Sequence, residues 1–441
     1  MSRIIQRSLH SEADVAVGGE GIRLHLASGK TVIDGSGGAA VACLGHGNQR
    51  VAAAVGAQAG RMAYAHTGFF TSAPAEALAE MLLGDEPGGL SHAFFVSSGS
   101  EAMEAAVKLA RQYFVETGEG RRVHVIGRRG SYHGNTLGAL AAGGHAMRRA
   151  HFEPMLSGAF SHVSPCFAYH HQGRDESDGQ YVARLAAELE GEFQRVGPDT
   201  VAAFCAEPVV GAATGCVAAV PGYFRAVREV CDRHGALLIL DEVMCGMGRT
   251  GTLHAWEQEG VVPDIQAVAK GLGGGYAPIG GILVAGRIIE GLRAGSGGFV
   301  HGQTYQAHPV ACAAALEVQR IIAEDGLVAN VARQGVVLER LLTERFGNHH
   351  QVGDIRGRGL FWALEFVEDR AERRPFAAGR GIAEQVKLAA LERGLGIYPC
   401  TGTLDGAAGD HVIVAPPYIV TEADLGEIVD RLGQAVDAVF A

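Results

Sequence analysis

Short apolar segments alternate with longer amphipathic segments through the middle of the chain. In the apolar segments hydrophobic side chains occupy consecutive positions, so both faces of an extended strand are apolar. Strands of this kind are typical of a sheet that helices cover on both sides. We predict such strands at residues 93–96, 123–126, 201–206, 237–240, 265–269 and 281–285.

The segments between these strands have the spacing of surface helices. In 101–114 the apolar residues recur three and four positions apart, while Lys108 and Arg111 fall elsewhere on the helix. Segments 179–196 and 223–234 are also predicted helices. Because strands and helices alternate over about 200 residues, the pattern predicts an α/β fold with a mostly parallel sheet.

The two ends of the chain have a different pattern. Residues 1–65 contain short, turn-rich segments that we interpret as small antiparallel strands. Beyond residue 325 we predict two helices and two strands, at 327–346, 382–392, 361–366 and 411–414. The prediction is therefore a large central domain over 66–325 and a small α+β domain built from 1–65 and 326–441.

Composition and charge narrow the classes of function. The 441 residues are 47% hydrophobic and 19% charged, which is ordinary for a globular protein. The net charge is −11 and no Lys/Arg-rich run occurs, so nucleic acid is not an expected partner. No apolar run reaches 18 residues and the first residues lack a cleavable signal pattern. We therefore expect a cytoplasmic protein with no membrane partner.

Cysteine and glycine add two further expectations. The eight cysteines are scattered and none forms a CxxC pair, so we expect buried thiols rather than a zinc site or a disulfide framework. Glycine, at 64 residues, is unusually frequent and has no fixed period. Such a composition indicates many tight turns and several places where the backbone comes close to a ligand.

Polar residues follow the carboxyl ends of the predicted strands, which is where open α/β sheets bind ligands. Ser98, Gly99 and Ser100 follow the first strand and open helix 101–114. The backbone N–H groups of such a turn suit a phosphate, although a simple serine N-cap has the same sequence.

The other strands are followed by an aromatic residue, two carboxylates and a lysine. Tyr132 and His133 come after strand 123–126, and an aromatic ring there is able to stack on a planar cofactor or to pack in the core. Glu207 and Asp241 come directly after the next two strands. Lys270 directly follows five largely apolar residues, which is an unusual place for a solvated lysine.

Two other kinds of site fit these residues less well. Asp241, Glu242, Glu207 and His133 are able to surround a divalent cation, but this leaves Lys270 without a role, and we expect no metal. The run GLGGGYAPIG has Tyr276 where the dinucleotide fingerprint GxGxxG requires glycine, which disfavours a nicotinamide enzyme.

Taken in order, the motifs resemble those of the class III (omega-type) aminotransferases, which are pyridoxal 5′-phosphate (PLP) enzymes of fold type I. The motifs are SGSEA (98–102), YHG (132–134), AEP (206–208), DEVMCGMGRTG (241–251), AKGLGGGYAPIGG (269–281), HGQTYQAHPVACAAA (301–315), IRGRGL (355–360) and APP (415–417). Because the set spans about residues 30–420 in the order of the family, it is much more specific than any one motif.

The resemblance implies a role for each candidate residue. Lys270 corresponds to the lysine that forms the Schiff base with PLP, and Asp241 to the carboxylate that keeps the pyridine nitrogen protonated. Tyr132 and Val243 correspond to the residues on the two faces of the ring. The catalytic set is therefore expected to be Lys270, Asp241 and Tyr132.

Other residues are expected to bind the cofactor less directly. Gly99 and Ser100, next to Ser98, correspond to the phosphate-binding turn, and Thr304 to a residue that reaches the phosphate from the neighbouring subunit of a dimer or tetramer. Glu207 corresponds to an acid near the O3′ side. His133 has either a direct role or a structural hydrogen bond. Arg249 and Arg356 look structural.

The resemblance implies transfer of an amino group in two half-reactions. An amino donor converts PLP to pyridoxamine phosphate, and a keto acid such as pyruvate or 2-oxoglutarate then accepts the amino group. A racemase, epimerase or aminomutase of the same family has the same cofactor residues, so these activities stay open. A PLP-binding regulator without activity is a further alternative, which the complete set of cofactor residues disfavours.

The chain departs from the family in its substrate-binding residues. Many relatives have an arginine shortly before the APP motif that binds the substrate carboxylate, but here no arginine occurs between Arg393 and Arg431. The segment TGTLDGAAGDH (401–411) is expected to be a loop near the entrance, where Asp405 and Asp410 are either simply solvated or favour a cationic amine. In HTGFFTS (66–72), Phe69 and Phe70 are expected to line the partner's pocket or to lie in the core.

Overall fold

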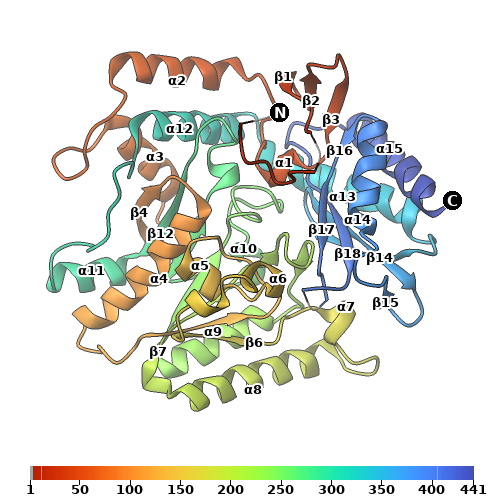
Figure 1. The fold of residues 1–441 in the computed structure, drawn as a ribbon. Helices are drawn as coiled ribbons and strands as arrows, with labels where there is room; N and C mark the ends of the chain where they lie inside the picture. The colour runs from red at the N-terminus through yellow and green to blue at the C-terminus, as the bar shows by residue number, and fades with distance from the viewer. Residues whose placement is uncertain (1–2, 11, 405) are drawn as a thin grey trace.

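A seven-stranded sheet forms the middle of the molecule (Figure 1). The computed structural model describes residues 3–10, 12–404 and 406–441. Strand β12 is antiparallel to both of its neighbours, and every other pairing in the sheet is parallel, which confirms the predicted α/β fold. In sheet order the strands are β4 (Leu90–Val96), β12 (Gly280–Ala285), β11 (Ile265–Val268), β10 (Leu237–Asp241), β7 (Val201–Ala206), β5 (His124–Arg128) and β6 (Phe160–Val163).

Helices cover both faces of this sheet. Along β10, Leu238 and Leu240 pack with helices α8 (Asp178–Val196) and α9 (Tyr223–His234). The alternate side chains of the same strand, such as Ile239, pack with α4 (Gly99–Glu116) on the opposite face. The consecutive apolar positions in the sequence therefore reflect a strand that is buried on both sides.

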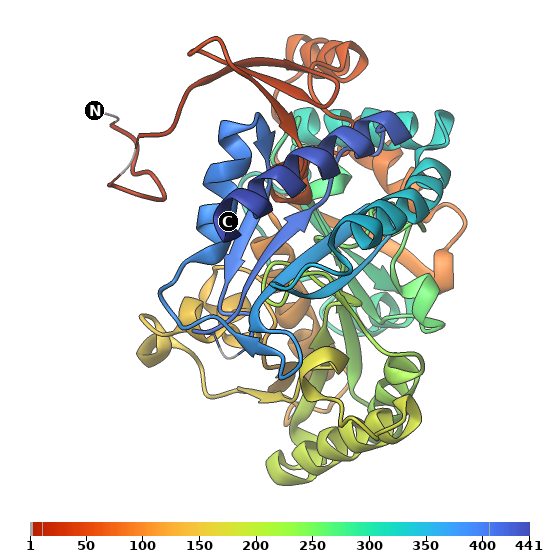
Figure 2. The same ribbon diagram turned by 90° about the vertical axis from the view of Figure 1, so that its right-hand side faces the viewer.

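The two ends of the chain meet in the smaller part of the molecule (Figure 2). Strand β3 pairs with β16, which joins the N-terminal strands to a segment more than 360 residues later. This sheet contains β1 (Ala16–Glu20), β2 (Arg23–Leu26), β3 (Thr31–Asp34) and β16 (Leu395–Gly396). A five-stranded sheet contains β13 (Val352–Arg358), β14 (Phe361–Asp369), β15 (Arg374–Pro375), β17 (Tyr398–Thr401) and β18 (Asp410–Val414). The helices of this part are α13 (Leu327–Phe346), α14 (Ile382–Glu392) and α15 (Glu422–Phe440).

Several helices were not predicted from the sequence. Helix α2 (Gln49–Arg61), which the Asn48 side chain caps, lies inside the segment for which only strands are expected. Helices α2 and α3 (Ala73–Leu83) both pack against α12 (Pro309–Glu324). The domain limits at residues 65 and 325 stay predictions.

The remaining short elements are α1 (Gly37–Ala40), α5 (Leu137–Ala142), α6 (Ala146–Arg149), α7 (Ala168–His171), α10 (Trp256–Glu259), α11 (Gly286–Ala294), β8 (Val209–Val210) and β9 (Val217–Ala218).

The expectation of a solvated loop over 401–411 is wrong at both ends, which belong to β17 and β18, and several residues between them, including Thr403, are buried. Asp410 is the first residue of β18, its side chain is buried, and its Oδ1 accepts a hydrogen bond from the Ala383 N–H at 3.3 Å. This carboxylate therefore fixes α14 to the sheet and is not available to attract a cationic amine. Asp405 lies outside the described residues.

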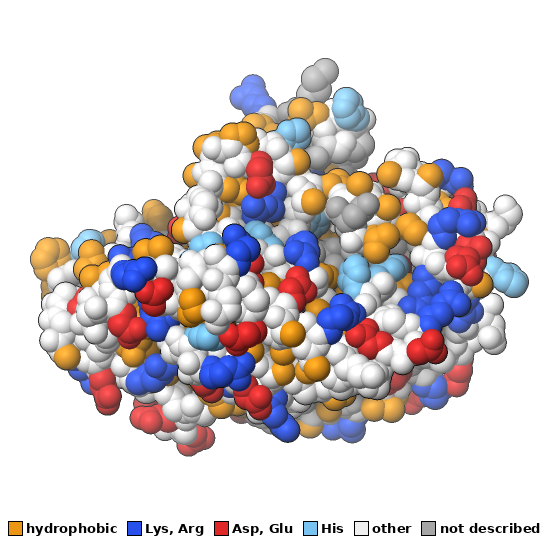
Figure 3. Space-filling view, turned by 90° about the horizontal axis from the view of Figure 1, so that it is seen from below, with side chains coloured by type: hydrophobic (Ala, Val, Ile, Leu, Met, Phe, Trp, Pro, Cys, Tyr) orange, Lys and Arg blue, Asp and Glu red, His pale blue; other side chains and the backbone are white. Residues whose placement is uncertain are grey.

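Surface and cysteines agree with the composition. In the part of the chain that the structure describes, no helix is long and apolar enough to cross a bilayer. On the face seen in Figure 3, basic and acidic side chains are interspersed. All eight cysteines are buried and unbridged, as expected.

Phe204, in β7, tests how far the central sheet depends on its packing. Its side chain is fully buried in the apolar cluster on the α8 side of the sheet. We expect Phe204→Ala to lower the free energy of unfolding by about 3–5 kcal/mol, because the truncation leaves a cavity. Urea denaturation measures this change. Phe152→Ala, at an exposed ring, is the control and should stay within about 0.5 kcal/mol of the parent chain.

Candidate active site

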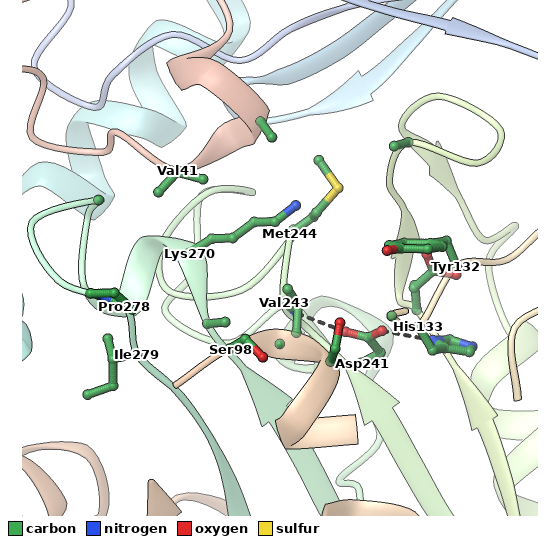
Figure 4. A pocket seen from close by; sticks show the side chains of 18 of the residues that line it. Val41, Ser98, Tyr132, His133, Asp241, Val243, Met244, Lys270, Pro278 and Ile279 are labelled. Atoms are coloured by element: carbon green, nitrogen blue, oxygen red, sulfur yellow. Dashed lines mark hydrogen bonds and ion pairs between the residues drawn. The ribbon is translucent and has the colours of Figure 1, made fainter. Parts of the chain in front are cut away.

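A cavity of about 490 Å³ lies at the carboxyl ends of the central strands (Figure 4). Its walls come from the turns after β4, β5, β7, β10 and β11, and from the N-terminal and C-terminal segments of the chain. Nine of the residues predicted from the sequence line it, namely Ser98, Gly99, Ser100, Tyr132, His133, Glu207, Asp241, Val243 and Lys270. The sheet topology therefore brings these residues together from positions that are up to 172 apart in sequence (98 to 270).

Lys270 reaches into this cavity from the turn that follows β11 (Figure 4). The residue begins a single 3₁₀ turn, and its φ of 45° lies in the left-handed region, which is unfavourable for a residue with a Cβ. Burial lowers the pKa of the Lys270 amine to about 8, against the opposing effect of the nearby Asp241 and Glu207 carboxylates. At pH 7 about a tenth of this amine is therefore uncharged and nucleophilic, far more than for a solvated lysine.

Asp241, the last residue of β10, forms a buried ion pair with His133. The Nδ1 of His133 lies 2.7 Å from Oδ2 of Asp241, and the exposed fractions of the two side chains are 0% and 5%. Burial disfavours a charged His133 ring, but the hydrogen bond to Asp241 and the nearby Glu207 carboxyl act in the opposite direction, and the pKa of His133 is raised. The other Asp241 oxygen, Oδ1, accepts a hydrogen bond from the Val243 N–H at 3.0 Å. These contacts hold Asp241 as an orientated carboxylate at the base of the cavity.

Glu207 is a second carboxyl group beside this pair. Burial raises its pKa to about 7, with His133 and Arg128 lowering it and Asp241 raising it further. Its Oε2 is buried and has no hydrogen-bond partner among the described residues. A buried polar atom without a partner at a cavity wall indicates that a ligand supplies the partner.

The turn before α4 has the features both of a serine N-cap and of a phosphate-binding turn, the two interpretations of its sequence. The Ser98 hydroxyl caps the helix by accepting a hydrogen bond from the Glu101 N–H at 3.2 Å. The Gly99 and Ser100 N–H groups belong to the first helical turn, where the helix itself has no acceptor for them. A Cβ on Gly99 would lie 2.8 Å from Cγ1 of Val243, so only glycine lets β10 and α4 meet this closely. The 18-residue helix therefore presents its positive end to the cavity.

Tyr132 and Val243 stand on opposite sides of the space in front of Asp241 (Figure 4). Val243 approaches from the turn after β10, and Tyr132 from the turn after β5. Behind this turn, Gly134 has a φ of 138°, and a Cβ there would lie 2.7 Å from the Ser100 hydroxyl. The close approach positions the Tyr132 turn against the start of α4.

Comparisons with known proteins agree over almost the whole chain. The family described as Aminotransferase class-III matches residues 7–436. An uncharacterized aminotransferase of Schizosaccharomyces pombe is 49% identical, with 96% of this chain and 92% of the relative covered. The chain belongs to the class III aminotransferases.

Solved structures agree with this assignment. A thermostable (S)-enantioselective omega-transaminase from Thermomicrobium roseum superposes with a TM-score of 0.92 at 37% identity, covering 98% of this chain and 94% of its own. The omega-transaminase of Pseudomonas jessenii in complex with PMP has a TM-score of 0.90 at 34% identity, covering 97% and 93%. The predicted family and fold are therefore confirmed for this aminotransferase.

Thr304 is the one predicted site residue that does not line the cavity of its own chain. Its side chain is exposed, on a segment that begins after α11. Phe69 and Phe70 are also exposed, at 79% and 68%, so the alternative that they lie in the core of this chain is wrong. The roles assigned to these three residues across a subunit interface stay predictions.

Glu242, which the sequence also offers as a metal ligand, turns away from the cavity of the aminotransferase. Its carboxyl oxygens accept hydrogen bonds from the Ala255 and Trp256 N–H groups, both at 2.7 Å, and from Nε2 of Gln266 at 2.9 Å. Among the described residues, no group of three His, Cys, Asp or Glu side chains is arranged to hold a metal ion. Arg249 donates to the carbonyls of Leu360 and Pro416, which agrees with the structural role expected for it.

Several cavity residues of the aminotransferase escaped prediction because they lie outside the central strands. Val41 and Ala39 come from the N-terminal segment, Tyr398 from β17, and Arg148 from α6. Arg148 stacks on the Tyr132 ring, with Cζ 4.4 Å from the ring centroid. None of these positions has a sequence pattern that separates it from an ordinary surface or core residue.

The lowered pKa of Lys270 is directly measurable, because the chain has only four lysines, Lys30, Lys108, Lys270 and Lys387. In protein freed of any bound cofactor, the rate at which acetic anhydride acetylates Lys270 should reach half its maximum near pH 8. The reason is that the uncharged amine, which reacts, becomes the major form above that pH. Peptide mass spectrometry follows each lysine separately.

Lys108, which is exposed on α4, is followed in the same digests as the internal control. The variant Asp241→Asn should move the Lys270 midpoint below pH 8, because the Asp241 charge stabilises the protonated amine. A Lys270 midpoint equal to that of Lys108 would contradict the electrostatics described above.

Proposed function

We propose that this aminotransferase carries pyridoxal 5′-phosphate on Lys270 and transfers an amino group from a primary amine or an ω-amino acid to a keto acid such as pyruvate or 2-oxoglutarate. The observation that carries the proposal is the convergence of Lys270, the His133–Asp241 pair and the start of α4 on one cavity. Each group matches a different chemical function of the cofactor, namely its aldehyde, its ring nitrogen and its phosphate.

The residues present fit such a cofactor. Gly99 and Ser100 offer N–H groups to a phosphate at the positive end of α4, next to the Ser98 cap. The orphaned Oε2 of Glu207 is positioned for a polar group on the O3′ side of the ring. Tyr132 and Val243 lie on opposite sides of the cavity in front of Asp241, where each is able to pack on one face of a flat aromatic ring.

When bound, PLP supplies a carbonyl for the incoming amine and a ring that accepts electron density from the substrate Cα. With the cofactor bound, Lys270 would act as the base that takes the proton from the substrate Cα and gives it to the carbon on the other side of the bridging nitrogen, for which its lowered pKa is suited. Asp241 holds the proton on the ring nitrogen, and His133 keeps that carboxylate charged and orientated.

The transfer proceeds in two half-reactions on the same set of residues. The donor leaves as a carbonyl compound before the keto acid enters, so one cavity serves both substrates in turn. Among relatives with named substrates, the diaminobutyrate–2-oxoglutarate transaminase of Halomonas elongata is 35% identical and the putrescine–pyruvate aminotransferase of Pseudomonas aeruginosa is 31% identical. Both names pair an amine-bearing donor with a keto acid, which supports the proposed substrate classes.

We further propose that two copies of the chain form each active site, in a cytoplasmic homodimer. Large apolar side chains are strongly exposed around the Thr304 segment: Phe69 and Phe70 line one hollow together with Gln306 and Ala307, and Val300 lies four residues before Thr304. Exposed apolar side chains in this number favour a protein interface. Thr304 of one copy is proposed to reach the phosphate site of the other. The unbridged cysteines favour a reducing compartment.

Removing the lysine tests the central claim. We expect Lys270→Ala to lose the yellow absorbance of the purified enzyme and at least about 10³-fold in kcat, because no other lysine lies in the cavity. Absorbance spectra and a panel of amine donors with pyruvate or 2-oxoglutarate measure both effects. Full turnover by Lys270→Ala would contradict the assignment. Inversion of a chiral amine without transfer to the keto acid would point instead to a racemase.

The His133–Asp241 pair has its own test. We expect His133→Phe to weaken PLP binding about tenfold, since the buried Asp241 loses its hydrogen-bond donor and is less stable as a charged group. Equilibrium dialysis of PLP against the variant measures this affinity. His124→Phe is the matched control, because His124 lies at the other end of β5 and bonds to Ser161 outside the cavity. Equal affinities for the two variants would exclude the role given to His133.

A further inference from the structure

Arg148 is a cation at the rim of the active-site cavity that has no acidic partner. Its guanidinium stacks on Tyr132, with Cζ 4.4 Å from the ring centroid, and the side chain lines the cavity. In the described part of the chain, no Asp or Glu forms an ion pair with it, although ion pairs are frequent elsewhere on the surface. The guanidinium therefore has donors available for an anion that enters the cavity.

The neighbouring Arg149 differs from Arg148, because its guanidinium is fully engaged in bonds within the chain. Arg149 donates to the carbonyls of Leu140, Ala141 and Gly143 and pairs with Glu153. These bonds tie α6 to the end of α5. Arg148 therefore projects from a helix that is fixed in place. One face of its planar guanidinium packs on the Tyr132 ring, so the N–H groups along its edge are available to a carboxylate.

Tyr398 approaches the same guanidinium from β17. Burial raises the pKa of the Tyr398 hydroxyl, and a hydrogen bond from Arg148 together with the nearby Arg7 partly opposes this effect. Tyr398 lies within the stretch between Arg393 and Arg431, where many relatives of this class have their carboxylate-binding arginine and this chain has none. Arg148 therefore places a positive charge beside the position that lacks one.

We propose that Arg148 binds the carboxylate of the keto acid acceptor and so sets the preference of the enzyme for acceptors that carry one. The proposal rests on the transaminase function proposed above. Three cations line the cavity besides His133, namely Arg7, Arg148 and Lys270. Lys270 is used in the chemistry, and Arg7 lies in the extended N-terminal segment before β1, with no helix to position it. Arg148 is the one that secondary structure holds in place.

The test compares acceptors that differ only in the carboxylate. Steady-state kinetics of the holoenzyme are measured with pyruvate and with acetaldehyde, which is pyruvate without its carboxylate, at a fixed amine donor. We expect Arg148→Gln to raise KM for pyruvate about tenfold with little change in kcat, as the loss of a charge-assisted hydrogen bond at a partly exposed site predicts. Turnover of acetaldehyde should change less than about twofold, and Arg148→Lys should recover part of the loss.

Two controls and one direct binding measurement complete the design. Arg121→Gln removes the same charge at an exposed ion pair with Asp199 and should change neither acceptor. Calorimetric titration with propanoate, a carboxylate that does not react, should show about tenfold weaker binding to Arg148→Gln than to the parent holoenzyme. This readout does not require turnover, so it tests Arg148 even if the proposed transaminase activity is not found.

Three results would overturn the proposal. Equal losses with pyruvate and acetaldehyde would mean that Arg148 only supports Tyr132. A loss specific to pyruvate in Arg7→Gln, with Arg148→Gln unaffected, would assign the carboxylate to Arg7. Unchanged propanoate affinity in Arg148→Gln would exclude contact with the anion.

Discussion

The buried bond between His133 and Asp241 is the interaction on which the rest of the site depends. Taking a carboxylate out of water costs several kcal/mol unless a partner compensates it, and His133 supplies that partner at 2.7 Å. Once Asp241 is held as a charged group, it raises the pKa of Glu207 and limits the fall in the pKa of Lys270. Burial is the larger influence on both of these pKa values, and the pair formed by the end of β10 and the turn after β5 modifies its effect.

The backbone around this pair is built for close approach. Glycine at position 99 lets Val243 pack on the start of α4, and Gly134 lets the Tyr132 turn meet Ser100. Lys270 has a positive φ, which the surrounding packing must impose because a residue with a Cβ disfavours it. The unusual backbone conformations therefore lie in the turns that follow the strands, while the strands themselves are regular. The abundance of glycine in the sequence follows in part from these contacts.

Sequence periodicity predicted the position of a helix with one apolar face, and of a strand with two apolar faces. The predicted helices 223–234, 327–346 and 382–392 coincide with α9, α13 and α14, because each has a clear polar side. Helix α12 was missed because most of its residues are apolar and buried, so its pattern has no polar face. Asp410 was predicted to lie in a loop because the residues around it are rich in glycine and aspartate. Its carboxylate in fact bonds to the Ala383 N–H, a contact between distant segments that no local pattern reveals.

From the sequence alone, six of the seven strands of the central sheet and the residues at their ends were predicted, and with them the family, Lys270, Asp241 and the turn at Gly99, whereas β6 was missed. These are local properties, because the residue that follows an apolar strand is read directly from the chain. The tertiary structure showed what Glu242 does instead: it accepts hydrogen bonds from the backbone N–H groups of residues 255 and 256, while Asp241 lines the cavity. It also brought Arg148 onto Tyr132 and next to Tyr398, about 250 residues later, since such contacts depend on how distant segments pack and leave no periodic trace in the sequence.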